Sequence, residues 1–217
     1  TDASAIDAIS MVLNGLINTQ LGALCRSFGI SAIGIGGIDG GLVQAHRRAP
    51  VTLAGGEVVD YGLVGDIDGI DGSVVTRLLD SGFLPVVSPL SCDSSGQLLN
   101  INADTVAAAI GGALVAEKLI LCTGAPGILE RLDDPHSLIS YTDLAGLHRL
   151  REKGAITDGM LPKSSAIEAA ILGGVRRVHV ISYAETDSLL AEIFTNEGKG
   201  TLVVADTKAL TAAEQGQ

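Results

Sequence analysis

The sequence predicts an α/β fold in which helices cover both faces of a largely parallel β-sheet. Two observations predict this class. Short apolar runs alternate along the chain with stretches in which apolar residues recur at helical spacing. Several runs, such as residues 83–90 and 118–123, are apolar throughout, which is typical of strands buried on both faces of a parallel sheet. The length of 217 residues suits one such domain.

The amino-terminal half supplies a long helix and a group of strands. Apolar side chains at Ile6, Ile9, Leu13 and Leu16 recur every three or four residues, which predicts a helix over residues 2–28. The apolar runs that follow are bounded by glycine, aspartate or proline, which are typical of turns. They predict strands at 30–35 and 61–67, a hairpin at 42–53, a turn at 66–72, a helix at 72–81 and a strand at 83–90.

The carboxyl-terminal half alternates more regularly. An alanine-rich helix over residues 106–116 leads into an apolar strand at 118–123. Pro162 is well placed as a first helical residue and Gly173 as a helix end, which predicts a helix over 162–172. The other predicted elements are helices at 142–152 and 186–194 and strands at 176–181 and 201–204.

The composition excludes several classes of partner. The formal net charge of −11 is unsuited to binding nucleic acid or an anionic membrane surface. The longest apolar run, residues 106–116, is about half of a membrane span, so we expect no membrane partner. Three cysteines without paired spacing predict a cytoplasmic protein, and four scattered histidines predict no protein metal site.

Three polar residues mark the start of the alanine-rich helix. Asn100, Asn102 and Asp104 occupy every second position after an apolar run, so an extended chain would place them on one face. Helix capping explains Asp104, because its side chain can accept hydrogen bonds from first-turn amides. Capping leaves the two asparagines unexplained, whereas a polar ligand site at the carboxyl end of a strand would explain all three.

Lys163 stands in the first turn of the helix predicted over 162–172, where the helix dipole disfavours a positive charge. An anion shared by this lysine and the helix amides would remove the conflict, and a solvent-exposed lysine is the alternative. Gly159 and Met160 precede it and supply a backbone that can lie against a flat ligand. The glycine-rich segment at 33–41 is by itself a weak phosphate-loop signal, because no helix pattern follows it.

Several segments together resemble the amino acid kinase family, and within it the acetylglutamate kinases. They are GIGGIDGGLV, YGLVGDID, LLDSGFLPVVSPL, LLNINADTVAAAIGGAL, EKLILCTGAPGIL, GAITDGMLPK and LLAEIFTNEGKGT, in family order. The resemblance implies one domain over residues 1–217, an open three-layer αβα sandwich with a mainly parallel sheet. It also implies transfer of the γ-phosphoryl group of ATP to the γ-carboxylate of N-acetyl-L-glutamate in arginine biosynthesis. Residues 1–95 would belong to the half that binds the acyl amino acid and residues 96–217 to the half that binds ATP.

The resemblance also implies roles for individual residues. Lys163 would neutralise the transferring phosphoryl group, Asp104 would orient the catalytic lysines, and Asn100 with its neighbour Asn102 would hold the substrate. Mg²⁺ would be held mainly by the nucleotide phosphates. Residues lining the nucleotide would be Thr123, Gly124, Gly127, Leu129, Gly159 and Met160. Arginine-inhibited members carry an element that His179, Glu192 and Gly198 resemble, which makes arginine a possible effector, and we expect a homo-oligomer.

The sequence departs from the family in ways that leave two alternatives open. The family's K-x-G-G loop is absent, so we expect an N-terminally truncated chain. Gly124 replaces a usual aspartate, Gly36 a usual Ser or Thr, and Ile38 a usual Lys. The alternatives are a kinase acting on aminoadipate or glutamate joined to a carrier protein, and a non-catalytic module for arginine sensing or oligomerisation.

Overall fold

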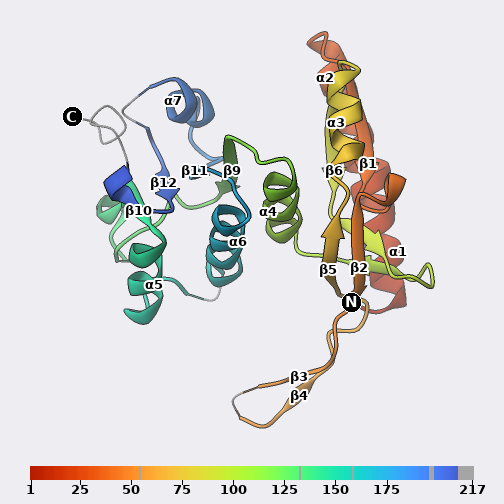
Figure 1. The fold of residues 1–217 in the computed structure, drawn as a ribbon, viewed down its shortest axis with the longest axis horizontal. Coiled ribbons are helices and arrows are strands. Elements are labelled where there is room, and N and C mark those ends of the chain that lie inside the picture. The colour runs from red at the N-terminus through yellow and green to blue at the C-terminus, as the bar shows by residue number, and fades with distance from the viewer. Residues whose placement is uncertain (54, 132, 158, 196–197, 210–217) are drawn as a thin grey trace. The chain divides into compact units, whose positions relative to one another are not determined.

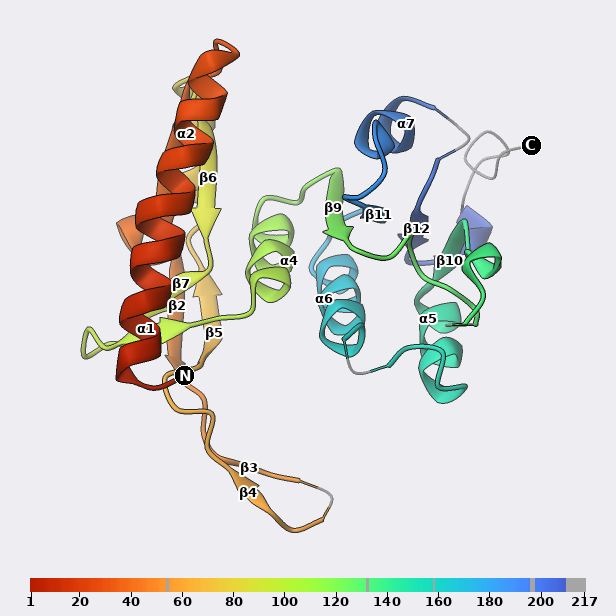
Figure 2. The same ribbon diagram turned by 180° about the vertical axis from the view of Figure 1, so that it is seen from behind.

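The computed structural model describes residues 1–209 except 54, 132, 158 and 196–197. The chain divides into two compact units, Thr1–Val106 and Ala107–Gln217, which are drawn in Figures 1 and 2. The division falls inside helix α4 (Ala103–Ala113). The predicted division of function between residues 1–95 and 96–217 stays a prediction.

The first unit opens with the predicted long helix. It runs through α1 (Ala3–Ser10), the π-helical turn η1 (Met11–Ile17) and α2 (Asn18–Ser27). Its first turn is capped by Asp2, whose carboxylate accepts a hydrogen bond from the Ala5 amide at 2.7 Å. The 25 residues from Ala3 to Ser27 are long and apolar enough to cross a membrane by length and composition. Core helices of soluble proteins and signal sequences share that property, and the absence of a membrane partner stays a prediction.

This helix covers one face of a parallel strand pair. Strand β1 (Ala32–Gly36) pairs with β6 (Leu84–Ser88) in parallel. Helix α2 packs on one face of the pair and α3 (Ser73–Asp80) on the other, as the two opposite views show (Figures 1 and 2). The predicted strands at 30–35 and 83–90 and the helix at 72–81 are therefore confirmed within one or two residues.

A second sheet of this unit corrects two predictions. Its strand order is β5 (Gly65–Ile70), β2 (Val43–Arg47), β7 (Leu90–Cys92) and β8 (Leu98–Asn100). The predicted hairpin over 42–53 is wrong, because β2 pairs with β5, which also shows that residues 66–70 are strand rather than turn. A non-local partner supplies the hydrogen bonds of this glycine- and aspartate-rich segment, and local sequence does not reveal such a partner.

The intervening chain forms a separate hairpin. Strands β3 (Val51–Thr52) and β4 (Val58–Val59) pair antiparallel, and both views show them as a projecting ribbon (Figures 1 and 2). A short 3₁₀ turn, η2 (Asp39–Gly41), joins β1 to β2.

The second unit is built on the sheet β10 (Tyr141–Asp143), β12 (Thr201–Val204), β11 (Arg177–Ser182) and β9 (Lys118–Thr123). Strands β9 and β11 are parallel, as are β10 and β12, whereas β11 and β12 are antiparallel. Helix α6 (Leu161–Leu172) packs against α5 (Leu144–Glu152) and β11, and α7 (Ser188–Phe194) also packs on β11. Two 3₁₀ turns complete the unit, η3 (Pro135–Ser137) and η4 (Thr207–Ala209).

Branched aliphatic residues fill the core of the second unit. Leu147, Ile167, Val178, Val180 and Val203 are fully buried in one cluster between the helices and the sheet. Strand β11 is buried along nearly its whole length, which is typical of a strand covered on both faces. The predicted α/β class with mainly parallel strands and helices on both faces is thus confirmed.

Candidate functional site

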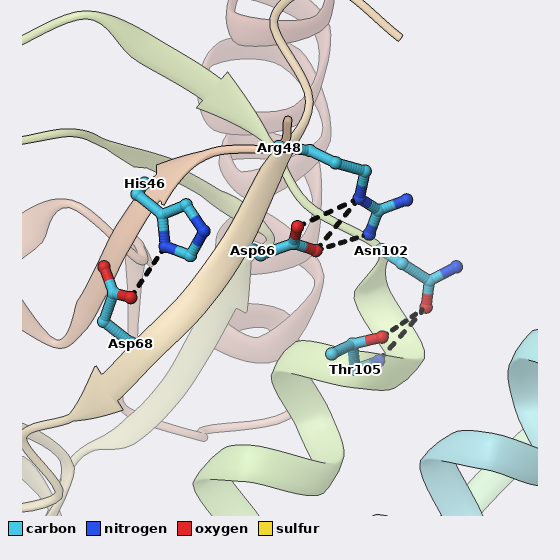
Figure 3. A network of polar contacts seen from close by, with 6 residues as sticks. All are labelled: His46, Arg48, Asp66, Asp68, Asn102 and Thr105. Carbon is cyan, nitrogen blue, oxygen red and sulfur yellow. Dashed lines mark hydrogen bonds and ion pairs between the residues drawn. The ribbon is translucent and has the colours of Figure 1, made fainter. Parts of the chain in front are cut away.

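The polar residues at the start of α4 belong to the first unit and play different structural parts. Strand β8 ends at Asn100 and α4 begins at Ala103, so Asn100, Asn102 and Asp104 do not lie along one extended strand. Asn102 is the capping residue: its Oδ1 accepts hydrogen bonds from the Thr105 amide at 3.1 Å and the Thr105 hydroxyl at 3.3 Å (Figure 3). The interpretation of Asp104 as the cap is therefore wrong, because the helix starts before it and places it in the first turn.

Asn100 is fixed by the short segment that precedes β5. The backbone N–H of Asn100 donates to the Leu63 carbonyl at 2.9 Å, and Val64 forms a parallel β-bridge with Asn100. Its side-chain Nδ2 lies 3.4 Å from the Thr1 hydroxyl, and the residue is half-buried. The main chain and the side chain of Asn100 are therefore both held by hydrogen bonds at the end of β8.

An arginine that sequence reasoning missed lies beside the same segment. The Arg48 amide donates to the Val64 carbonyl at 2.8 Å, next to the residue that bonds Asn100. Its guanidinium donates to both oxygens of Asp66 at 2.6–3.1 Å (Figure 3), and these bonds hold the pKa of Asp66 below its usual range. In the sequence, Arg48 shows only as a charged residue directly after a strand, which does not indicate a partner 18 positions away.

The predicted nucleotide residues of the second unit gather at the carboxyl end of its parallel strands. Thr123 ends β9, and its carbonyl accepts a hydrogen bond from Tyr183, which directly follows β11, at 2.9 Å. Gly124 is exposed, and a Cβ added there would lie 3.1 Å from the Tyr183 hydroxyl. In α/β sheets this strand end is where ligands bind. Tyr183, which contacts both Thr123 and Gly124, is the second residue after Arg48 that the sequence did not indicate.

The loop after Gly124 is held by Thr201 of β12. Gly127 is buried, and a Cβ there would come within 2.7 Å of both the Thr201 hydroxyl and the Leu138 side chain. The Ile128 amide donates to that hydroxyl at 2.8 Å. Leu129 forms a β-bridge with Leu138. Gly127 is therefore required by close packing of the loop, and Leu129 anchors its far end.

Lys163 lies where the sequence predicts it, in the first turn of α6 and half-buried. Met160 stands at the N-cap without a side-chain capping bond, and exposed Gly159 precedes it. Helix α6 packs on β11, and a short turn connects the end of the helix to the start of the strand. The two elements therefore run in opposite directions, and the first turn of α6 lies at the carboxyl end of β11. The fold thus brings Lys163 to the same sheet end as Thr123 and Gly124.

The glycine-rich segment at 33–41 has a packing explanation. A Cβ added to Gly37 would lie 2.8 Å from the Leu90 carbonyl oxygen and from the Val43 side chain. A Cβ at Gly36 would lie 2.8 Å from the Asn14 side chain, and the Gly36 amide donates to Asp39 at 2.7 Å. Close backbone approach therefore requires these glycines whether or not a phosphate binds nearby.

The three residues considered as an arginine effector site lie together. His179 Nδ1 is 2.8 Å from Glu192 Oε1, and the two side chains are almost fully buried. The Gly200 amide donates to Glu192 Oε2 at 3.0 Å, and a Cβ added to Gly198 would collide with the same carboxylate. The pair spans β11 and α7 and links the sheet to the helix that covers it.

The described part of the chain has no side-chain cluster of the kind that binds metal ions in proteins. Among those residues, no three His, Cys, Asp or Glu gather closely enough to hold an ion.

Comparison with known proteins identifies the family of this chain. The model of the amino acid kinase family matches residues 1–182. The chain belongs to the amino acid kinase family. The acetylglutamate kinase of Myxococcus xanthus is 45% identical over 221 residues, which cover 100% of this chain and 72% of that protein. The acetylglutamate kinase of Methanopyrus kandleri is 42% identical over 203 residues, covering 94% and 78%.

A solved member of the same fold superimposes on the chain. The N-acetylglutamate synthase from Neisseria gonorrhoeae, complexed with coenzyme A and N-acetyl-glutamate, has a TM-score of 0.81 at 25% identity. The match covers 95% of this chain and 45% of that protein, so the chain spans less than half of it. The amino acid kinase fold predicted from the sequence is confirmed.

Proposed function

We propose that this protein transfers the γ-phosphoryl group of ATP to the γ-carboxylate of N-acetyl-L-glutamate, a step of arginine biosynthesis. The observation that carries the proposal is the 45% identity, across the whole chain, to a relative named acetylglutamate kinase. Lys163, in a helix first turn at the carboxyl end of a parallel sheet, supports it. Of the alternatives, a carrier-linked substrate has no supporting observation among the residues that the structure describes.

The proposed mechanism relies on charge and positioning. Phosphoryl transfer between two anions needs positive charge at the transferring group, and no covalent nucleophile. The Lys163 ammonium and the amides at the start of α6 would stabilise the charge that develops on the γ-phosphoryl oxygens.

The remaining residues would bind and orient the substrates. The loop from Thr123 to Leu129, with Gly159 and Met160, would line the nucleotide, and its glycines allow close backbone approach. By the resemblance, Asn100 would hold the acyl amino acid and Asp104 would orient the catalytic lysines, while Asn102 would fix the helix start on which Asp104 stands. Mg²⁺ would be held mainly by the nucleotide phosphates, since the described residues offer no cluster of side-chain ligands.

Replacement of Lys163 tests the assignment. Lys163→Ala should lower kcat by about two orders of magnitude or more, because it removes charge stabilisation from the transition state. Lys153→Ala is the control, because Lys153 is an exposed lysine at the end of α5. The measurement is steady-state formation of ADP that depends on N-acetyl-L-glutamate. Near-normal kcat in Lys163→Ala, with the control unchanged, would reject the proposed role.

We also infer that arginine regulates the protein through the region of His179, Glu192 and Gly198. The proximity of the three residues supports this. The buried His179–Glu192 pair means that a guanidinium group would have to compete with the imidazole for the carboxylate, or bind beside the pair. Unchanged activity at saturating arginine would remove the hypothesis.

Self-association in the cytoplasm is the last part of the proposal. The long helix exposes an unusual row of large apolar side chains, with Met11 68%, Leu16 55% and Leu24 54% exposed. Such a row is costly in water and is typical of an interface. We propose that a second copy of the chain covers it.

A further inference from the structure

A cluster of charged and polar side chains joins α5 to α6 in the second unit. Arg151 lies in the last turn of α5. Ser164 and Glu168 lie one turn apart on α6, and Ser164 directly follows Lys163 in the sequence. The cluster therefore reaches the turn of α6 that carries Lys163.

The Arg151 guanidinium holds α6 at two points. Its Nε donates to the Ser164 hydroxyl at 2.9 Å, and its Nη1 donates to Glu168 Oε2 at 2.7 Å. Ser164 is 0% exposed, and its hydroxyl donates in turn to the carbonyl of Leu161, the first residue of α6, at 2.9 Å. Because the guanidinium is planar and rigid, two contacts one helical turn apart restrict both the rotation and the sliding of α6.

His148 completes the clamp from the same side. Its Nε2 lies 2.8 Å from Glu168 Oε1, so both oxygens of Glu168 are held by residues three positions apart on α5. The hydrogen bond from Arg151, and to a smaller extent the one from His148, lowers the pKa of Glu168 below its usual range. Glu168 is therefore ionised at neutral pH, and its contact with Arg151 is a charge-assisted one.

The start of α6 needs such support. Met160 occupies the N-cap without a side-chain capping bond, and uncapped helix ends tend to fray. We infer that Arg151 is a positioning residue for Lys163: by clamping Ser164 and Glu168 it holds the first turn of α6, and with it the Lys163 amine, in the orientation that phosphoryl transfer requires. The chemical consequence rests on the function proposed above, whereas the placement of Lys163 can be tested apart from it.

Arg151→Met tests the inference, because methionine keeps much of the side-chain length but has neither the charge nor the planar set of N–H donors of the guanidinium (the fork). Arg149→Met is the matched control, since Arg149 is an exposed arginine on the same helix. The first readout is the rate at which an amine-acetylating reagent modifies Lys163, measured by mass spectrometry against Lys118 and Lys199 in the same protein. The second is kcat compared with KM for Mg-ATP, at a temperature where circular dichroism shows the variants folded.

In Arg151→Met the rate of Lys163 modification should rise by about threefold or more, with the reference lysines unchanged, because the first turn opens more often. The kcat should fall by about tenfold or more while KM changes by less than about threefold, because misplacement affects the transition state most. Arg151→Lys keeps the charge without the fork and should recover part of the loss. Arg149→Met should match the parent protein in both readouts.

Unchanged modification of Lys163 in folded Arg151→Met would overturn the inference. So would a normal kcat in this variant when Lys163→Ala is inactive, or full recovery in Arg151→Lys, since charge alone would then suffice. If Lys163→Ala itself stays active, the proposed function fails, and the modification rate still decides whether Arg151 holds Lys163. If Arg151→Met does not fold, Glu168→Gln decides by the same two readouts, because it removes the charge from the clamp and keeps the side-chain shape.

Discussion

At the residue scale, the buried pair of His179 and Glu192 couples the second unit to pH. Burial alone would raise the pKa of Glu192, but hydrogen bonds from His179 and the Gly200 amide outweigh that effect, so its pKa lies below the ordinary 4.5. A carboxyl group whose pKa is lower in the folded state stabilises the fold above its unfolded-state pKa. That contribution is lost as the pH falls through the folded-state pKa.

We therefore expect the free energy of unfolding to fall as the pH drops from the ordinary pKa of 4.5 through the lower pKa of Glu192 in the folded state, and to fall less steeply in Glu192→Gln. Urea titrations at several pH values would measure both slopes. Other carboxylates with lowered pKa, such as Asp66 and Asp143, contribute equally to the two proteins and cancel in the comparison. Glu152→Gln, at an exposed position of α5, should keep the parent slope. Equal slopes in all three proteins would contradict the prediction.

Sequence reasoning at this scale succeeded where the local pattern was sufficient. Pro162 and the glycines after residue 172 placed Lys163 correctly in the first turn of α6, because helix ends are set by nearby residues. Arg48 and Asp66 could not be paired in the same way, since 18 positions separate them and strand pairing alone brings them together. The clamp between Arg151 and Glu168 likewise exists only because α5 packs on α6.

At the scale of elements, α4 shows how one side chain decides where a helix begins. Asn102 accepts two hydrogen bonds from Thr105 and stops the strand conformation before Asp104. The alternating asparagines suggested that the chain stays extended through Asp104. In the structure the chain turns into a helix instead, because Asn102 caps the first turn of α4. Asp104 therefore stands on a helix end, where a carboxylate is favoured by the helix dipole.

Asn102→Ala should lower the free energy of unfolding by about 1 kcal/mol, within a range of roughly 0.5–2 kcal/mol, because the first-turn amide loses its cap. Asn102→Asp keeps an accepting oxygen and should stay within a few tenths of the parent. Urea unfolding followed by circular dichroism at neutral pH measures the difference. Equal stability of the alanine and aspartate variants would show that the cap contributes nothing.

At the scale of the whole molecule, the long helix from Ala3 to Ser27 carries the main exposed apolar surface of the first unit. Leu16, Leu21 and Leu24 are exposed on it, and Phe28 is exposed directly after its last residue. The same composition gives the helix its resemblance to a membrane span. A second copy of the chain would cover these side chains without a membrane.

We expect the protein to self-associate, and Leu24→Glu to raise the dissociation constant by about tenfold or more, since burial of one leucine contributes roughly 1.5–3 kcal/mol. Sedimentation velocity over a range of concentrations would measure this. Leu172→Glu is the matched control, because Leu172 is an exposed leucine, 73% accessible, at the end of α6 and outside the long helix. A parent protein that stays monomeric, or an equal effect of both variants, would exclude this surface as the interface.

The sequence by itself determined the α/β class, the order of most helices and strands, and the position of Lys163 in a helix first turn. These depend on periodicity, apolar runs and turn residues, which act over a few neighbouring positions. Only the tertiary structure decided that residues 65–70 are a strand, that Asn102 rather than Asp104 caps α4, and that Arg151 holds α6. The strand and the Arg151 contacts depend on partners that are distant in the sequence, because hydrogen bonds and ion pairs form between groups that folding brings within about 3 Å. The cap joins residues three positions apart, and it was settled by where β8 ends and α4 begins.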